Sequence, residues 1–318
     1  MSNLDTRPIE QECHRAAGSG ARTTLIPARE VPLGGVRAMS VSRTLPSKLL
    51  PLVGAWCFFD QMGPERVEMR VLPHPHTGLQ TVTWPLAGEI RHRDSLGSDV
   101  IIKPGQLNLM TSGAGIAHSE FSLGGGDSLL HALQLWVALP SEVAPGPAGF
   151  EQHRNLPQLV ESGLRATVFI GELGDARSPA TVHTPMVGAD LEIDAGAAVT
   201  LPLRADFEHA VLVIAGSVEV AQTELDAGPL LYLGTGRTEL SLASSVGARL
   251  VLLGGEPFPD ELVMWWNFVG RSHEEIVQAR TDWENHAARF GVVEGHGAER
   301  IPAPPIPPMR LTPRRRVL

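Results

Sequence analysis

Two short stretches of this 318-residue chain carry metal-binding side chains two residues apart. His74 and His76 stand in LPHPHTG, and His118 and Glu120 stand in GIAHSEF. Side chains at positions i and i+2 of a β-strand point to the same face, so each pair would form a chelate if it lay on a strand. Pro75 stiffens the first pair and is tolerated at the start or edge of a strand. Each pair therefore predicts one wall of a metal site.

Strands that face each other would bring three imidazoles and one carboxylate together and leave one or two coordination positions open. This ligand set suits one non-haem Fe(II) per chain, with manganese, nickel, copper or zinc not excluded. The alternative is a set of ordinary core or surface histidines. Two pairs within one β-rich region favour the metal. Glu120 is also our candidate for a general base, and the sequence does not separate that role from metal ligation.

The other histidines give weaker signals. His92 and His131 fall in the same region and could contact the metal ligands from behind or line a pocket, but we interpret them as ordinary packing residues. We place a further group of histidines at the surface: His14, His153, His183, His273, His286 and His296.

Short β-prone runs alternate with Gly, Pro, Asp and Ser from Thr23 to about Pro140, which is typical of a β-sandwich or barrel. The Pro- and Gly-rich stretch 141–149 reads as a linker. The pattern then repeats, because PLAGEIRH is similar to VIAGSVEV and PGQLNLMTSG is similar to AGPLLYLGTG. We interpret residues 208–257 as a degenerate copy of 80–140, and hence the chain as a duplicated all-β domain.

The second copy lacks the metal-binding pairs. We therefore expect a single metal, in the N-terminal domain, and a metal-free second domain that serves packing or closure. Alignment by eye gives these matches: Pro202 for His74, Arg204 for His76, Ser241 for His118 and Ala243 for Glu120.

A helix is predicted near the C-terminus, over about 273–290. Ser272 and Glu275 form a capping box at its start, and Gly291 ends it. The His-Glu pair in its first turn resembles the start of a zinc-protease motif. That interpretation fails because Val277 stands where the second histidine would be.

Composition excludes several classes of function. The formal charge of −9 and the isoelectric point near 5.7 argue against a broad nucleic-acid-binding face. Cys13 and Cys57 are the only cysteines, so no disulfide framework is indicated. The N-terminus has no signal-peptide pattern, and no apolar run is long enough to cross a bilayer. We expect a cytoplasmic protein that contacts neither membrane nor nucleic acid, and a solvated end at Arg314, Arg315 and Arg316.

The run HPHTGLQTVTWPLAGEIRHRDSLG, followed by PGQLNLMTSGAGIAHSE, closely resembles the pirin family of the cupin superfamily. The later segment WWNFVGRSHEEIVQARTDW is similar to the one that closes bacterial pirins, so the resemblance spans about residues 20–300. It implies a bicupin, in which two antiparallel β-barrels face each other. It also implies iron at the positions matching His74, His76, His118 and Glu120. Leu109 departs from a bulky aromatic that is common in the family, which predicts a changed pocket shape and substrate.

The resemblance implies two classes of function. Pirin relatives are described as quercetin 2,3-dioxygenase-like enzymes or, in eukaryotes, as nuclear iron-dependent co-regulators of transcription. We expect a dioxygenase that takes a flavonol or another enolic aromatic substrate together with dioxygen. The alternative is a metal-dependent redox sensor that acts through a protein partner. We expect a monomer, because two fused domains can cover each other's sheets.

These observations predict five segments along the chain. They are an irregular N-terminal segment at 1–20, a metal-binding cupin domain at 21–140, a linker at 141–149, a metal-free cupin domain with the helix at 150–300, and a Pro- and Arg-rich tail at 301–318.

Overall fold

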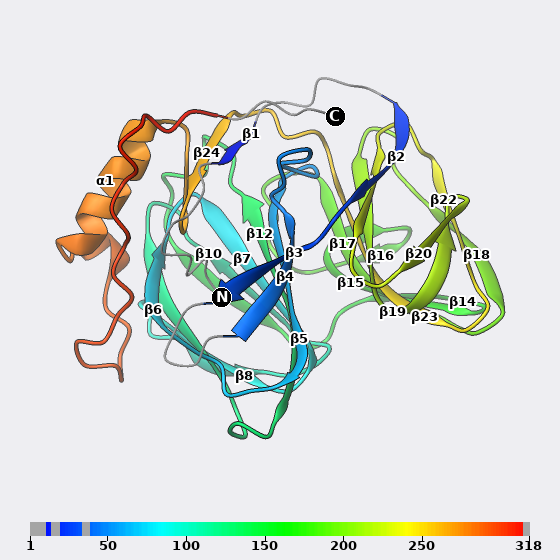
Figure 1. The fold of residues 1–318 in the computed structure, drawn as a ribbon, viewed down its shortest axis with the longest axis horizontal. Coiled ribbons are helices and arrows are strands. Elements are labelled where there is room, and N and C mark those ends of the chain that lie inside the picture. The colour runs from blue at the N-terminus through cyan, green and yellow to red at the C-terminus, as the bar shows by residue number, and fades with distance from the viewer. Residues whose placement is uncertain (1–10, 14–19, 34–38, 314–318) are drawn as a thin grey trace.

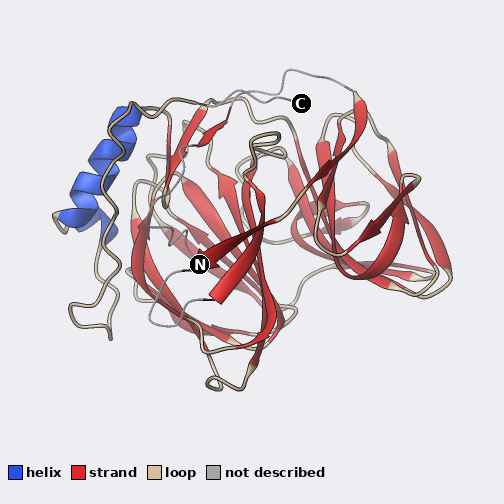
Figure 2. Ribbon diagram, viewed as in Figure 1, coloured by secondary structure: helices blue, strands red, loops and turns tan. Residues whose placement is uncertain are grey.

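The computed structural model of the chain describes residues 11–13, 20–33 and 39–313. Strands dominate it, and one α-helix lies at the C-terminal end (Figures 1 and 2). The expected all-β architecture with a short C-terminal helix is confirmed. The described helices include none that is long and apolar enough to span a membrane.

The first half of the chain contains two sheets. The larger has seven strands, in pairing order β13 (Gly149–His153), β10 (Leu107–Thr111), β7 (Leu79–Ala87), β12 (Leu129–Ala138), β5 (Trp56–Arg66), β4 (Met39–Leu45) and β3 (Arg29–Leu33). The smaller has four, in the order β6 (Arg70–His76), β11 (Ile116–Ser122), β8 (Ile90–Asp94) and β9 (Asp99–Ile102).

The second half repeats this plan. Its main path runs through β14 (Gln158–Glu161), β15 (Leu164–Leu173), β17 (Met186–Ile193), β23 (Ala248–Gly255), β19 (Glu208–Val220), β21 (Leu230–Gly234) and β2 (Ala21–Ile26). The remaining strands pair beside it: β16 (Ala176–Arg177), β18 (Ala197–Pro202), β20 (Thr223–Asp226) and β22 (Glu239–Ser244). The pairing of β18 with β22 matches that of β6 with β11, as a duplication predicts.

The halves exchange edge strands across the predicted domain boundaries. Strand β2 precedes the first half in sequence but pairs with β21 of the second, and Figure 1 shows it crossing over. Strand β13 follows the predicted linker but pairs with β10 of the first half. The boundaries at 140 and 150 stay a prediction, since hydrogen bonding does not divide the chain there.

The largest apolar cluster joins the two halves. Phe169 of the second half stacks on Trp84, with ring centroids 5.1 Å apart, and meets the edge of Trp56. The indole N–H of Trp84 donates to Asp190 at 2.9 Å, and that of Trp56 donates to the carbonyl of Val187. The buried indole N–H groups of Trp84 and Trp56 thus both have a partner across the interface.

The chain end closes one side of the first half. Strands β1 (Gln11–Cys13), β24 (Leu262–Trp265) and β25 (Phe268–Gly270) form a small sheet, and the helix α1 (His273–Glu284) follows. Gln11–Cys13 therefore belong to a strand rather than to an irregular segment; the rest of the predicted 1–20 segment, Gly20 apart, lies outside the described residues.

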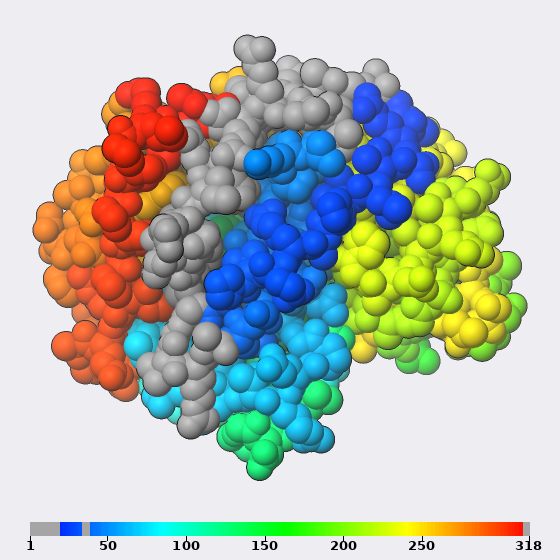
Figure 3. All heavy atoms as spheres, in the orientation of Figure 1, coloured from blue at the N-terminus to red at the C-terminus, as the bar shows by residue number. Residues whose placement is uncertain are grey.

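The predicted capping box is confirmed in part. The Glu275 N–H donates to the Ser272 hydroxyl at 3.2 Å, but the Glu275 carboxylate accepts from the backbone N–H of Arg271, at 2.9 Å, instead of from that of Ser272. The helix ends at Glu284, short of the predicted end near 290, and a separate 3₁₀ turn, Ala288–Phe290, leads to Gly291. The tail at 301–313 packs along α1 and is seen beside it in Figure 3. The triple arginine at 314–316 lies outside the described residues.

A row of contacting side chains leads from a buried ion pair to His76. The Arg43 guanidinium makes two hydrogen bonds to the Asp60 carboxylate, at 2.6 and 2.7 Å, and both side chains are buried. Arg43 also lies 4.3 Å from the ring centroid of Phe58, which stacks on Trp136 at 4.0 Å. The Trp136 ring meets the His76 imidazole edge-on at 5.2 Å.

We predict that Asp60→Ala lowers the free energy of unfolding by about 3 to 5 kcal/mol, because it leaves a buried guanidinium without its carboxylate. Urea unfolding followed by tryptophan fluorescence measures the change. Glu192→Ala is the matched control, since its pair with Arg165 is about half exposed and should contribute less than about 1 kcal/mol. Equal losses for both variants would contradict the role given to the buried pair.

Candidate metal centre

The four predicted ligands lie on two neighbouring strands. Strands β6 and β11 are antiparallel, and His118 pairs directly with His74. Directly opposed residues in an antiparallel pair share a face, so these side chains meet between the two sheets. A shift of register between His118 and Glu120 marks a local irregularity in the strand. His74, His76, His118 and Glu120 are all fully buried.

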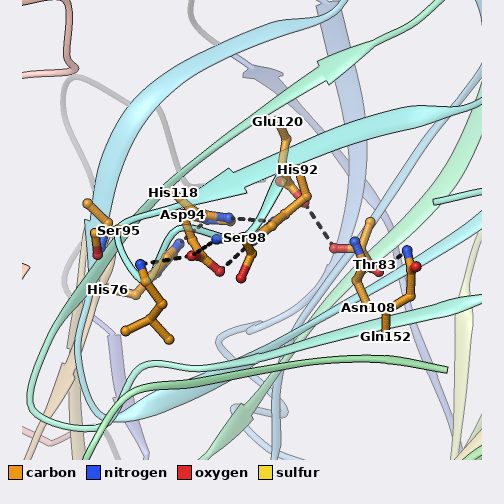
Figure 4. A network of polar contacts seen from close by, with 12 residues as sticks. His76, Thr83, His92, Asp94, Ser95, Ser98, Asn108, His118, Glu120 and Gln152 are labelled. Carbon is orange, nitrogen blue, oxygen red and sulfur yellow. Dashed lines mark hydrogen bonds and ion pairs between the residues drawn. The ribbon is translucent and has the colours of Figure 1, made fainter. Parts of the chain in front are cut away.

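The three histidines gather tightly. Their candidate ligand atoms lie within 4.8 Å of one another, and the Nε2 atoms of His76 and His118 are 3.1 Å apart. Glu120 belongs to a second, overlapping group with His92 and His118. His118 is shared, so the two groups form one continuous cluster. Figure 4 shows His76, His92, His118 and Glu120 of this cluster.

Backbone carbonyls fix the protonation of two of the rings. His74 Nδ1 lies 2.8 Å from the carbonyl oxygen of Leu72, and His76 Nδ1 lies 3.1 Å from that of Asn267. A carbonyl can only accept, so both rings carry their hydrogen on Nδ1. Both Nε2 atoms then carry a lone pair directed into the cluster, which is the form of histidine that binds a metal.

Burial keeps these imidazoles uncharged. It lowers the pKa of His76 to about 3. Burial, and next the neighbouring imidazoles, also hold the pKa values of His74 and His118 well below the usual 6.5. The Nε2 atoms of His76 and His118 face each other 3.1 Å apart in a dry interior, where a cation between them could bind to both. The donor set present therefore fits a divalent metal.

Glu120 reaches across to the larger sheet. Its Oε1 accepts a hydrogen bond from the Thr83 hydroxyl at 3.0 Å, and Thr83 lies on β7. The same hydroxyl is 3.2 Å from the side-chain oxygen of Gln134 on β12. These contacts orient the Glu120 carboxylate in the space between the sheets.

His92 is a member of this cluster that the sequence did not single out. Its Nδ1 is 3.4 Å from Nδ1 of His118, and its Nε2 is 3.2 Å from Asp94 Oδ2. The interpretation of His92 as an ordinary packing residue is wrong. The signal was available, because His92 and Asp94 have the same i, i+2 spacing as the other two pairs. His131, by contrast, is partly exposed and contacts Gln61.

Two further expectations need correction. His296 was placed at the surface, but it is buried and hydrogen-bonded to the Ser119 hydroxyl at 2.9 Å, since the chain end folds back over β11. Leu109 was expected to shape the pocket. It lies in the apolar cluster between the halves, whereas Asn108 pairs with Thr83 and shares its inward face. Alternation along β10 therefore points Leu109 away from the metal cluster.

Residues 262–270, which form β24, a turn and β25, contribute a residue that no motif indicated; we call them the closing segment. Asn267 lies in the turn between β24 and β25, and its backbone oxygen is the acceptor for His76. Gly78 brings this segment close, because its φ is +70° and a Cβ there would lie 2.2 Å from the oxygen of Val269. Any side chain at position 78 would push the segment away.

The corresponding space in the second half is filled by leucines. Leu201 of β18 and Leu240 and Leu242 of β22 are buried in an apolar cluster. Strand pairing sets Ser241 opposite Thr200 rather than Pro202, so the alignment by eye was two residues out of register on one of these strands. The absence of a metal from this half stays a prediction.

His209 is a buried histidine of the second half, and burial lowers its pKa to about 4. An unfolded histidine titrates near 6.5, so between these values the unfolded chain holds a proton that the folded chain lacks. The resulting stability is complete above about pH 6.5 and is lost as the pH falls toward 4.

We predict that His209→Gln flattens the pH dependence of the free energy of unfolding of the metal-free chain. Between about pH 4 and 6.5, unfolding of the variant should take up one proton fewer. The slope of the free energy of unfolding against pH should therefore fall by roughly 1.4 kcal/mol per pH unit. Urea unfolding at several pH values measures both slopes. Parallel curves for the variant and the unmodified chain would show that His209 is not the group responsible.

The duplicated two-sheet halves and a histidine-rich cluster in one of them define a two-domain cupin. A family model described as Pirin matches residues 37–137, and one described as Pirin C-terminal cupin domain matches residues 188–291. The chain therefore belongs to the pirin family, as the sequence resemblance implied.

Individual relatives agree with this assignment. A Pseudomonas aeruginosa protein named "Putative quercetin 2,3-dioxygenase" is 44% identical over 286 residues, which cover 89% of this chain and 90% of the relative. A "Pirin-like protein" of Caulobacter vibrioides is 37% identical over 290 residues, covering 87% and 97%. The crystal structure of a quercetin 2,3-dioxygenase from Acinetobacter baumannii has a TM-score of 0.85 and 38% identity, and the match covers 90% of this chain and 96% of that one.

Proposed function

We propose that this protein is a metal-dependent dioxygenase that acts on a flavonol, such as quercetin, or on another enolic aromatic compound. One observation carries the proposal: three uncharged, buried imidazoles and the Glu120 carboxylate gather between the sheets of the first half. The relatives named as quercetin 2,3-dioxygenases supply the substrate class. Iron is our first choice of metal, with manganese, nickel, copper or zinc as alternatives that the ligand set accepts.

We assign His74, His76, His118 and Glu120 as the residues that would hold the metal. The imidazoles would bind through Nε2, because Nδ1 of His74 and of His76 is engaged by a carbonyl. The metal would supply Lewis acidity toward an enolic oxygen and the electron chemistry that dioxygen requires. Burial excludes water from the ligands and strengthens every electrostatic interaction among them.

Glu120 is our candidate for the base. The reaction begins with an acidic enol or phenol hydroxyl, whose proton needs an acceptor near the metal. Thr83 donates to Glu120 Oε1 and thereby fixes the rotation of the carboxylate. The carboxylate could act as metal ligand, as proton acceptor, or as both in turn. Substrate and dioxygen are the partners that this proposal requires; a monomeric state and a cytoplasmic location remain predictions.

We predict that His76→Ala and Glu120→Ala each abolish stoichiometric iron uptake, because each removes one ligand of the centre. The metal content after anaerobic loading and desalting is measured by inductively coupled plasma mass spectrometry, with circular dichroism as the check on folding. His209→Ala is the matched control, since it removes a buried histidine from the second half and should leave the iron content unchanged. Stoichiometric iron in folded His76→Ala or Glu120→Ala would refute the site.

We predict that the iron-loaded protein consumes oxygen when quercetin is added. An oxygen electrode measures the rate, and the His76→Ala protein treated in the same way is the control. A fully loaded protein that turns over neither quercetin nor several other enediol and catechol compounds would contradict the enzymatic proposal. That outcome would favour the alternative of a redox-sensing protein that acts through a protein partner.

A further inference from the structure

We propose that Asp94 and His92 act as a positioning pair, which sets the tautomer of His118 so that its Nε2 carries a lone pair toward the metal. The inference rests on the proposed metal centre and adds two residues to it. Neither residue would touch the metal. Their part is to decide which nitrogen of His118 carries the hydrogen.

The contacts form a line of three side chains on neighbouring strands (Figure 4). Asp94 and His92 lie on β8, which pairs with β11 in a register that sets Asp94 opposite His118. Asp94 Oδ2 is 3.2 Å from His92 Nε2, and His92 Nδ1 is 3.4 Å from His118 Nδ1. The other nitrogen of His118, Nε2, is the atom that lies 3.1 Å from Nε2 of His76.

The carboxylate of Asp94 is held in place before it meets the imidazole. Its Oδ1 accepts from the backbone N–H groups of Leu96 and Ser98, at 2.9 and 3.0 Å. This turn leaves Oδ2 directed at His92 Nε2. His92 itself is buried, and its ring stacks on Phe150 of β13 at a centroid distance of 4.6 Å and an angle of 17°. Neither group can rotate away without losing these contacts.

The donor and acceptor roles then follow in order. An ionised carboxylate only accepts, so His92 carries its hydrogen on Nε2. In a neutral imidazole the other nitrogen is an acceptor, so His92 Nδ1 receives the Nδ1 hydrogen of His118. His118 Nε2 is then left with a lone pair. Outer partners of this kind commonly fix the tautomer and direction of a metal-binding histidine.

The tautomer of His118 is the one among the three imidazoles that a side-chain substitution can change. His74 and His76 reach the same tautomer through backbone carbonyls, which no side-chain substitution removes. The tautomer of His118 depends on side chains alone. A change at Asp94, whose side chain bonds to His92, should therefore affect metal binding through His92 and then His118.

Asp94→Asn tests this directly. The asparagine oxygen can still accept from Leu96 and Ser98, so the turn is kept, while an NH₂ group replaces Oδ2 and donates to His92 Nε2. The order then reverses: His92 Nδ1 becomes the donor, His118 Nδ1 the acceptor, and His118 Nε2 carries a hydrogen where the metal would bind. We expect the affinity for Zn²⁺, used as a redox-inert probe in competition with a chelator, to fall by about 10- to 100-fold.

The control is the same substitution in a His92→Phe background. Phenylalanine can keep the stacking on Phe150 but cannot pass a hydrogen bond from position 94 to His118. Asp94→Asn should therefore lower the Zn²⁺ affinity strongly when His92 is present and have little additional effect when Phe replaces it. An equal loss in both backgrounds would show a merely structural effect and overturn the proposal.

The metal-free protein provides an independent readout. Two-bond ¹H–¹⁵N correlation spectra of ¹⁵N-histidine-labelled protein at mildly alkaline pH report which ring nitrogen is protonated, and His118→Gln assigns the signal. We expect the hydrogen of His118 on Nδ1 in the unmodified chain and on Nε2 in Asp94→Asn. The same tautomer in both would overturn the positioning pair. If the tautomers switch as expected but the unmodified chain binds no Zn²⁺, iron or other divalent metal, the pair stands and the proposed metal centre fails.

Discussion

The antiparallel pairing of β6 with β11 is the constraint on which the site depends. It sets His118 opposite His74 and gives both strands a common inward face. The two pairs of proposed ligands, spaced at i and i+2, then meet without any long-range adjustment. The Trp136 ring beside His76, and the carbonyls that engage Nδ1 of His74 and of His76, hold two of these imidazoles in place.

The support for this pairing comes from distant parts of the chain. Asn267 reaches His76 from the closing segment, and Phe150 reaches His92 from the strand that follows the linker. The helix α1 and the tail pack behind the closing segment through the buried residues Ile276 and Trp283. Elements that contribute no proposed metal ligand thus help to determine the direction of the imidazoles.

The all-β architecture and the proximity of the two spaced pairs could be predicted from the sequence, because both follow from local rules. Spacing of two residues gives a shared face on any strand, which is why His74 with His76 and His118 with Glu120 could be paired before a fold was known. The capping box at Ser272 is equally local. The contact of His92 with His118 could not be predicted, although His92 has the same spacing with Asp94, because it depends on the register of β8 against β11, which local sequence does not specify.

Other features lay beyond local rules altogether. Asn267 contacts His76 through its backbone oxygen. Every residue has such an oxygen, so no residue type could indicate this contact. The inward or outward direction of Leu109 depends on the phase of β10, and one residue of shift reverses it. His296 is buried only because the chain end returns to β11.

The exchange of edge strands has a consequence for the order in which the molecule is made. A ribosome releases β2 long before β21 exists, and it completes the strands that bear the four proposed ligands well before β13 and Asn267 emerge. The first half can finish its own sheet only after β13 has emerged, near the middle of the chain, and the last partner of His76 arrives only when most of the chain has been synthesised. Maturation of the centre is in this way coupled to completion of translation, and a prematurely terminated chain would contain its ligands without the structure that orients them.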